Sequence, residues 1–149
     1  MDMSRSIGLD IGDRKIGVSL SDPSKTLASP LTTIIRTSDE QAINDIIKLV
    51  VKHGVVQVII GLPYSLNGDV GKQARKVLEF KDKISMSLVA EIIMQDERLS
   101  SVSANQKLRE AGKKRSKLKG EIDAAAATVI LQSYLDERDR DNSVIQPEY

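Results

Sequence analysis

The sequence predicts an α/β fold: a mixed five-stranded sheet, made of an antiparallel meander followed by parallel strands, flanked by helices. Three observations lead to this prediction. Apolar residues alternate twice along residues 6–21, on either side of a glycine-containing turn, which is typical of a β-hairpin. From Asp39 the apolar spacing becomes helical. After Gly54, short apolar runs alternate with helical segments, as they do where crossover helices join parallel strands.

Length and composition limit what the chain can do. Its 149 residues suit one compact domain, which we expect over residues 1–138 with a polar tail over 139–149. The chain has no cysteine and one histidine, which excludes disulfides, thiolate zinc sites and thiol nucleophiles and leaves carboxylates as the main titratable groups. No apolar run approaches the roughly 20 residues of a membrane span, and we expect a soluble cytoplasmic protein.

The first part of the chain is expected to form the meander and one helix. Residues 6–21 give the hairpin, and residues 29–35, rich in threonine and isoleucine, give a third strand. Asp39 is expected to cap a helix that stops at Gly54. The apolar residues at helical spacing in this helix are Ile43, Ile46, Ile47 and Val50.

The second part of the chain is expected to add two strands and three helices. Residues 55–62 form a continuous apolar run, as in a strand covered on both faces, and Pro63 ends it. A helix carrying Ala74, Val77, Leu78 and Ile84 follows, and then a strand over residues 88–94. We expect further helices over residues 101–111 and 122–135, the latter rich in alanine and able to pack closely.

Acidic residues from three separate segments are candidates for a common site. Asp10 lies between two aliphatic residues that point to the opposite face of its strand, and glycines leave space around it. Asp96 and Glu97 end the last strand, at the edge of the sheet where ligands collect in α/β proteins. Because adjacent residues of a strand face opposite sides, at most one of the two can face where Asp10 does. Asp123 borders the apolar face of the alanine-rich helix, where an acid is costly without a partner.

Converging carboxylates repel one another unless a cation joins them. Oxygen ligands without histidine or cysteine suit Mg²⁺ or Mn²⁺, and two such ions about 4 Å apart can promote phosphodiester hydrolysis. Each acid also has a structural explanation that the residues alone leave open. Asp10 could form a turn, Asp96 could cap the next helix or pair with Arg98, and Asp123 could stabilise a helix N-terminus.

Basic and glycine-rich segments are candidates for phosphate contacts. Residues 107–119 hold seven lysines and arginines against one acid, a local charge of +6 in a chain whose net charge is +1. A flexible basic segment directly before Asp123 favours nucleic-acid binding, and a solvated loop is the alternative. The turn containing Arg14 and Lys15 could embrace a phosphate, and the loop over residues 61–71 could hold one at a helix N-terminus.

Several motifs, taken in order along the chain, resemble one known family. They are Ile7-Gly8-Leu9-Asp10-Ile11-Gly12, Lys15-Ile16-Gly17-Val18, Ser21-Asp22, Gly61-Leu62-Pro63 with Gly68 and Gly71, Asp96-Glu97-Arg98-Leu99, and Lys119 with Asp123 and Ala125-Ala126. Together they cover residues 5–135 with matching order and spacing. The chain resembles the YqgF family, also called RuvX, which is Holliday junction resolvase-like and associated with a pre-16S rRNA nuclease activity.

This resemblance implies a ribonuclease H-like fold related to the RuvC resolvases and a metal-dependent nuclease that acts on structured nucleic acid. In bacteria the family is implicated in maturing the 5′ end of small-subunit ribosomal RNA. Matched residue by residue, it implies that Asp10, Glu97 and Asp123 are the catalytic and metal-binding acids. RuvC-type enzymes often carry a second acid on the last helix. Here Ala126 and Ala127 stand at the following turn, so the resemblance assures three acids and leaves open whether one or two metals bind.

The expected function is therefore hydrolysis of phosphodiester bonds at the 5′ end of pre-16S rRNA, with Mg²⁺ or Mn²⁺ as cofactor. The alternatives are a Holliday junction resolvase-like DNA endonuclease and a non-catalytic nucleic-acid-binding module in ribosome assembly or transcription. An ATPase of the actin-like or sugar-kinase type is disfavoured because it needs two such domains. The expected partner is nucleic acid, with RNA favoured over branched DNA, and a monomer and a homodimer both stay open. The residues expected to contact nucleic acid are Arg14, Lys15, Arg98, Lys113, Lys114, Arg115, Lys117 and Lys119.

Overall fold

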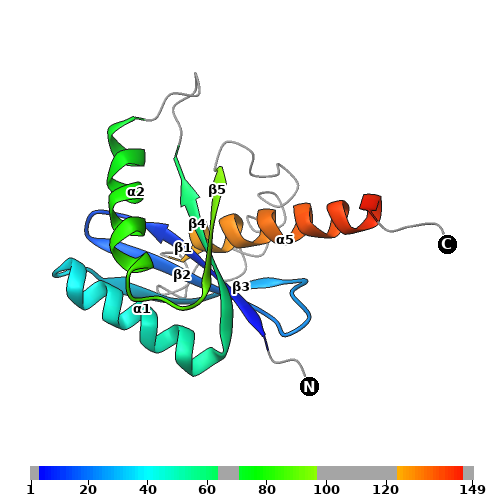
Figure 1. Cartoon of the computed structure of the whole chain (residues 1–149), viewed down its shortest axis with the longest axis horizontal. Coiled ribbons are helices and arrows are strands. Elements are labelled where there is room, and N and C mark those ends of the chain that lie inside the picture. The colour runs from blue at the N-terminus through cyan, green and yellow to red at the C-terminus, as the bar shows by residue number, and fades with distance from the viewer. Residues whose placement is uncertain (1–3, 64–70, 97–123, 146–149) are drawn as a thin grey trace.

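A mixed five-stranded sheet organises the molecule, as the sequence predicted. The computed structural model describes residues 4–63, 71–96 and 124–145, and the strand order in its sheet is β3-β2-β1-β4-β5 (Figure 1). The first three strands pair antiparallel, whereas β4 pairs parallel to β1 and β5 pairs parallel to β4. The strands are β1 (Arg5–Ile11), β2 (Lys15–Ser21), β3 (Ala28–Ile35), β4 (Val55–Leu62) and β5 (Glu91–Asp96).

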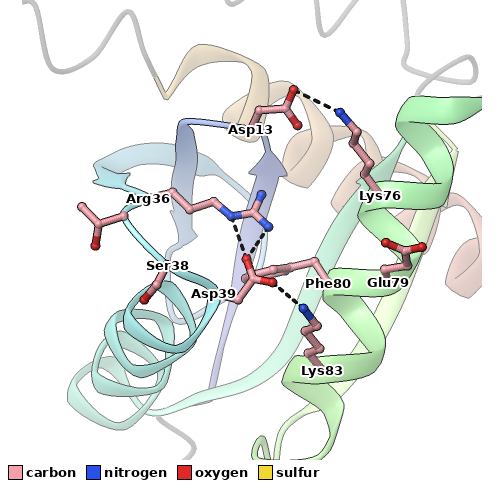
Figure 2. Close-up of a pocket in the computed structure, with 9 residues that line it drawn as sticks. Asp13, Arg36, Ser38, Asp39, Lys76, Glu79, Phe80 and Lys83 are labelled. Carbon is pink, nitrogen blue, oxygen red and sulfur yellow. Dashed lines mark hydrogen bonds and ion pairs between the residues drawn. The ribbon is translucent and has the colours of Figure 1, made fainter.

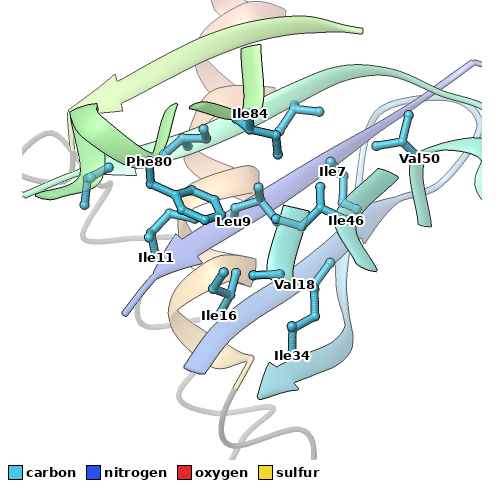
Figure 3. Packing of buried hydrophobic residues seen from close by; sticks show 14 of the residues in the cluster. Ile7, Leu9, Ile11, Ile16, Val18, Ile34, Ile46, Val50, Phe80 and Ile84 are labelled. Carbon is cyan, nitrogen blue, oxygen red and sulfur yellow. The ribbon is translucent and has the colours of Figure 1, made fainter. Parts of the chain in front are cut away.

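Helices cover both faces of this sheet. Helices α1 (Asp39–His53) and α2 (Lys72–Ser85) lie on one face, and α5 (Ala125–Ile145) lies on the other (Figure 1). The larger core fills the space between the sheet and the α1/α2 layer, and Phe80 is its only aromatic ring among the residues that the structure describes (Figure 3). A smaller core, containing Ile59, Ile130 and Leu131, lies under α5. None of the helices in the described part of the chain is long and apolar enough to cross a membrane.

Helix α1 begins one residue earlier than the sequence suggested. Its N-cap is Ser38, whose hydroxyl accepts a hydrogen bond from the backbone N–H of Gln41 at 3.1 Å, while the Gln41 side chain bonds back to the cap. Asp39 is instead the first helical residue, where its negative charge suits the positive end of the helix dipole. The predicted stop at Gly54 is confirmed, because this residue adopts the left-handed conformation at φ 62°.

Two elements differ from their predicted bounds. The last strand runs from Glu91 to Asp96 instead of over residues 88–94, because Val89 is fully exposed and pairing with β4 starts only at Glu91. Helix α5 continues to Ile145 instead of ending near residue 135, so the proposed tail begins within it. Its second half extends beyond the sheet and needs no apolar face, since helix growth from a packed segment adds one hydrogen bond per residue (Figure 1). The helix expected over residues 101–111 lies outside the described residues.

Helix α5 packs against the sheet with almost no gap at Gly8 of β1. A Cβ atom on Gly8 would lie 2.5 Å from Ser19 Oγ and 2.8 Å from both the Ala127 carbonyl oxygen and Leu131 Cβ. Ser19 on β2 fixes the helix here, because its hydroxyl donates a hydrogen bond of 2.7 Å to the Ala127 carbonyl. The close approach therefore requires a glycine at position 8.

Candidate functional site

Asp10 lies at the carboxyl end of the central strand β1 and faces the α5 side of the sheet. Its neighbours Leu9 and Ile11 are buried in the larger core, whereas Gly8, which has the same side-chain direction as Asp10, contacts α5. The predicted orientation of Asp10 away from the aliphatic core is confirmed. Its side chain is partly buried.

Glycines flank Asp10 within the sheet. Asp10 pairs with Gly17 of β2, which in turn pairs with Thr33 of β3. On the other side, the register of β1 with β4 ends at Leu9 opposite Ile60, so the next residue along β4, Gly61, stands beside Asp10. Because both neighbours are glycines, no side chain on the adjacent strands stands directly beside the Asp10 carboxylate.

The Asp10 carboxyl group is partly buried and has a shifted pKa. Burial raises the pKa of its carboxyl group above the ordinary value. Among the described residues, no side chain donates a hydrogen bond to it or forms an ion pair with it. A partly buried anion without a partner destabilises the fold, and a cation held at the carboxylate would relieve that cost.

The first turn of α5 lies at the same end of the sheet as Asp10. Ala127 sits above Ser19, and Gln132, one turn further along the helix, accepts a hydrogen bond of 2.9 Å from the backbone N–H of Ala28. Ala28 pairs with the far end of β2, so α5 runs away from Asp10 as it proceeds. The start of α5 is therefore its end nearest to Asp10.

The end of β5 shows whether Asp96 can share the face of Asp10. Gln95 is buried on the α5 side, where its Nε2 donates a hydrogen bond of 3.2 Å to Oε1 of Glu137. Met94 packs against the larger core on the opposite side. Asp96 has the same side-chain direction as Met94 in the strand, so it does not share the face of Asp10.

The turn between β1 and β2 places Arg14 and Lys15, both exposed, next to the Asp10 end of β1. The Gly12 N–H donates a hydrogen bond of 2.9 Å to the Lys15 carbonyl inside the turn, and a Cβ at Gly12 would lie 2.6 Å from that oxygen. The turn is also tied to Arg36, whose Nη1 donates a hydrogen bond of 2.8 Å to the Gly12 carbonyl. The Gly12 N–H is thus bonded within the turn and is not available to a phosphate, and the phosphate contact expected of this turn stays a prediction.

A polar pocket of about 270 Å³, which was not predicted from the sequence, lies on the α1/α2 side of the sheet (Figure 2). Asp39 joins both helices here, since it accepts hydrogen bonds from Lys83 Nζ at 2.6 Å and from Arg36 Nη2 at 2.7 Å. The bonds from Lys83 and then Arg36 lower the pKa of the Asp39 carboxyl. Arg36 also lies 4.7 Å from the centre of the Phe80 ring. Because its cations are paired with aspartates, we assign this pocket to holding α1, α2 and the turn together.

Most of the predicted site residues lie outside the described part of the chain. Asp10, Arg14 and Lys15 are described, and they gather at one end of the β1–β2 hairpin. Within the described residues, no group of three or more acidic or histidine side chains could hold a metal ion. The residues whose positions stay predictions are Glu97, Arg98, Lys113, Lys114, Arg115, Lys117, Lys119 and Asp123.

Comparison with known proteins points to one family. A profile of the RuvX family, described as "Holliday junction resolvase", matches residues 4–137. Curated proteins called "Putative pre-16S rRNA nuclease" match over 132 residues, or 89% of this chain. The protein from Chloroflexus aurantiacus is 47% identical and 86% covered, and that from Clostridium botulinum is 48% identical and 96% covered.

Solved structures show the same fold at low sequence identity. RuvC from Thermus thermophilus, in complex with a Holliday junction substrate, superposes with a TM-score of 0.61 at 11% identity, covering 91% of this chain and 96% of that one. The fowlpox virus resolvase in complex with Holliday junction DNA gives 0.55 at 10% identity, covering 95% and 99%. These likenesses confirm the expected fold, the ribonuclease H-like architecture of RuvC.

Proposed function

This chain belongs to the RuvX family, and on that premise we propose that it is a metal-dependent nuclease that hydrolyses phosphodiester bonds of precursor 16S rRNA. Its relatives from Chloroflexus and Clostridium are called pre-16S rRNA nucleases, and the match extends over most of this chain and of each relative. The observation that carries the proposal is the partly buried Asp10 carboxylate, with glycine on both sides and no partner among the described residues. A role in rRNA processing implies that the protein acts in the cytoplasm.

We propose that Asp10, Glu97 and Asp123 together hold Mg²⁺ or Mn²⁺. These three carboxylates fit such an ion, because hard divalent cations prefer carboxylate oxygens. The partly buried Asp10 carboxylate also has no positive partner among the described residues, and the ion would supply one. Glu97 is preferred to Asp96 because Asp96 shares the face of Met94, which is opposite to the face of Asp10. Asp123 directly precedes Ala124, at the end of α5 nearest to Asp10.

The chain's own residues would then orient the substrate. A divalent cation lowers the pKa of a coordinated water and neutralises charge on the attacked phosphate. Arg14 and Lys15, exposed beside the Asp10 end of β1, supply positive charge to phosphates that approach the strand edge. The basic segment over residues 107–119 would contact the phosphates of the nucleic-acid backbone.

The test is cleavage of a precursor 16S rRNA fragment by the purified protein, with and without Mn²⁺, and with a DNA four-way junction as the second substrate. We expect cut RNA only when the metal is present. Asp10→Asn, Glu97→Gln and Asp123→Asn should each reduce the rate by at least about 100-fold, since each removes a metal ligand. The matched control is Asp13→Asn, an exposed aspartate on the adjacent turn, which should leave the rate unchanged.

Each of the other outcomes would indicate a different function for this protein. Full activity in Asp10→Asn would refute the assignment of the site. Cleavage of the junction but not of the RNA would indicate the resolvase-like DNA endonuclease. If RNA binds and neither substrate is cut at any metal concentration, the protein is the non-catalytic binding module.

A further inference from the structure

Thr33 carries a buried hydroxyl group that has no partner. Among the described residues, its Oγ1 is the one buried side-chain oxygen or nitrogen atom without a hydrogen bond. Other hydroxyls buried in the same layer are bonded: Ser19 to the Ala127 carbonyl at 2.7 Å and Thr128 to the Ala124 carbonyl at 2.8 Å. Buried hydroxyls in native proteins are almost always satisfied, so this exception calls for an explanation.

The position of Thr33 in the sheet connects it to Asp10. Thr33 on β3 pairs with Gly17 on β2, and Gly17 pairs with Asp10 on β1. Residues paired across adjacent strands point to the same face, so Asp10 and Thr33 both face the α5 side, where Ser19 of β2 contacts the helix. Gly17 puts no side chain between them. The spacing of two strands separates their backbones by about 10 Å.

Among the described residues, the Thr33 hydroxyl contributes no hydrogen bond to the fold. Valine has nearly the same shape as threonine, suits a strand equally well and leaves no unsatisfied oxygen. An unpaired buried hydroxyl lowers stability relative to valine, so its presence beside the candidate site favours a role in binding a ligand.

We propose that Thr33 is a substrate-positioning residue: its side chain is only partly buried, and rotation about χ1 turns the hydroxyl outward to hydrogen bond to the sugar–phosphate backbone of a nucleic-acid strand lying across Gly17. This inference rests on the proposed nuclease function and adds the direction of the strand over the sheet, from Asp10 toward β3. Because the two side chains lie two strands apart, Thr33 contacts a nucleotide next to the one that is cleaved. A hydroxyl group both donates and accepts, so it can bond a phosphate oxygen or a ribose 2′-hydroxyl.

The experiment compares three variants with the wild-type protein. Thr33→Val removes the hydroxyl, Thr33→Ser keeps it, and Thr32→Val makes the same change on the same strand, opposite Val18 on the other face. The Kd for the rRNA fragment is measured by fluorescence anisotropy without divalent metal, KM and kcat are measured with Mn²⁺, and Tm is measured for each protein.

We expect Thr33→Val to raise Kd and KM by about 3- to 10-fold, the effect of one lost hydrogen bond, with kcat unchanged. Its Tm should equal or exceed that of the wild-type protein, which a purely structural role for the hydroxyl would not produce. Thr33→Ser should restore binding, and Thr32→Val should not change it. An effect confined to RNA identifies the 2′-hydroxyl as the partner, whereas an equal effect on DNA of the same sequence identifies the phosphate.

Wild-type Kd and KM in Thr33→Val would overturn the inference. Should the valine variant fail to fold, Thr33→Ala and Thr33→Ser are compared, because these two differ only in the hydroxyl. The inference and the proposed function fail in distinguishable ways. If wild type cuts RNA and Thr33→Val does so with unchanged KM, only the inference is wrong. If wild type binds RNA without cutting it and Thr33→Val binds more weakly, only the nuclease function is wrong.

Discussion

Burial raises the pKa of the Asp10 carboxyl, because the ionised form loses contact with water and gains no partner among the described residues. A folded-state pKa above the unfolded value means that the native protein binds more protons than the unfolded chain in the interval between the two. Stability contributed by this group is therefore present at low pH and is lost as the pH rises through the folded-state pKa. At neutral pH, the charge on Asp10 opposes folding.

Asp10→Asn is accordingly expected to raise the free energy of unfolding at pH 7 by about 0.5–2 kcal/mol, the usual range for stabilising substitutions. Urea denaturation without metal measures the difference. It should shrink as the pH is lowered toward 4, because protonated aspartic acid and asparagine are both neutral and have almost the same shape. Asp13→Asn is the control and should show no stabilisation, since Asp13 is exposed and lies 3.5 Å from Lys76.

The same variants test the metal site without any measurement of activity. Mn²⁺ that binds only the folded protein should raise the Tm of the wild type and of Asp13→Asn, and it should not raise the Tm of Asp10→Asn. Equal shifts in all three proteins would contradict a metal bound at Asp10.

At the scale of elements, the position of α5 depends on the absence of a side chain at Gly8. Gly8→Ala would push its Cβ against the Ala127 carbonyl and Leu131 Cβ, so the helix has to move away from β1 and β2. We expect a loss of about 1–3 kcal/mol in the free energy of unfolding, the usual cost of overpacking a core.

Ser19→Ala, which removes the hydrogen bond to Ala127 without adding atoms, should cost about 1 kcal/mol. Cleavage should fall more in Gly8→Ala than in Ser19→Ala, because only the former displaces the start of α5. Unchanged stability in Gly8→Ala would show that the helix tolerates the displacement.

Elements were predictable from the sequence where a local pattern determines them. The hairpin of β1 and β2, the glycine stop of α1 and the continuous run of β4 each follow from the spacing of apolar residues and turn residues. The end of α5 was not predictable, because the sequence over residues 136–145 carries no apolar stripe to mark where the helix stops. The pairing of Thr33 with Gly17 was missed because the β2–β3 register contains an irregularity after Val18, which no local pattern indicates.

The candidate site was predictable to a different extent at each residue. The face of Asp10 followed from strand alternation, and the exclusion of Asp96 needed only the observation that Gln95 faces α5. The Arg36–Asp39–Lys83 cluster was missed because Lys83 lies 44 positions from Asp39 in the sequence, and only the docking of α2 against α1 brings them together.

At the scale of the whole molecule, the distribution of charge determines where nucleic acid can bind. The chain is almost neutral, but residues 107–119 carry +6, which leaves −5 on the rest. A phosphate backbone is therefore attracted by one segment and repelled on average elsewhere. Since each phosphate contact releases counterions, the logarithm of the binding constant should fall steeply with the logarithm of salt concentration.

Replacing Lys113, Lys114, Arg115, Lys117 and Lys119 by glutamine should weaken RNA binding and flatten this salt dependence. Each residue that contacts a phosphate of a single strand should reduce the slope by about 0.7. Fluorescence anisotropy titrations at several salt concentrations give the slope, and the Tm verifies that the variant is folded. The control is Lys48→Gln with Lys52→Gln, two exposed lysines of α1 on the opposite side of the sheet from α5. If the control flattened the slope as much per residue as the basic segment does, binding would depend on total charge and the basic segment would have no special role.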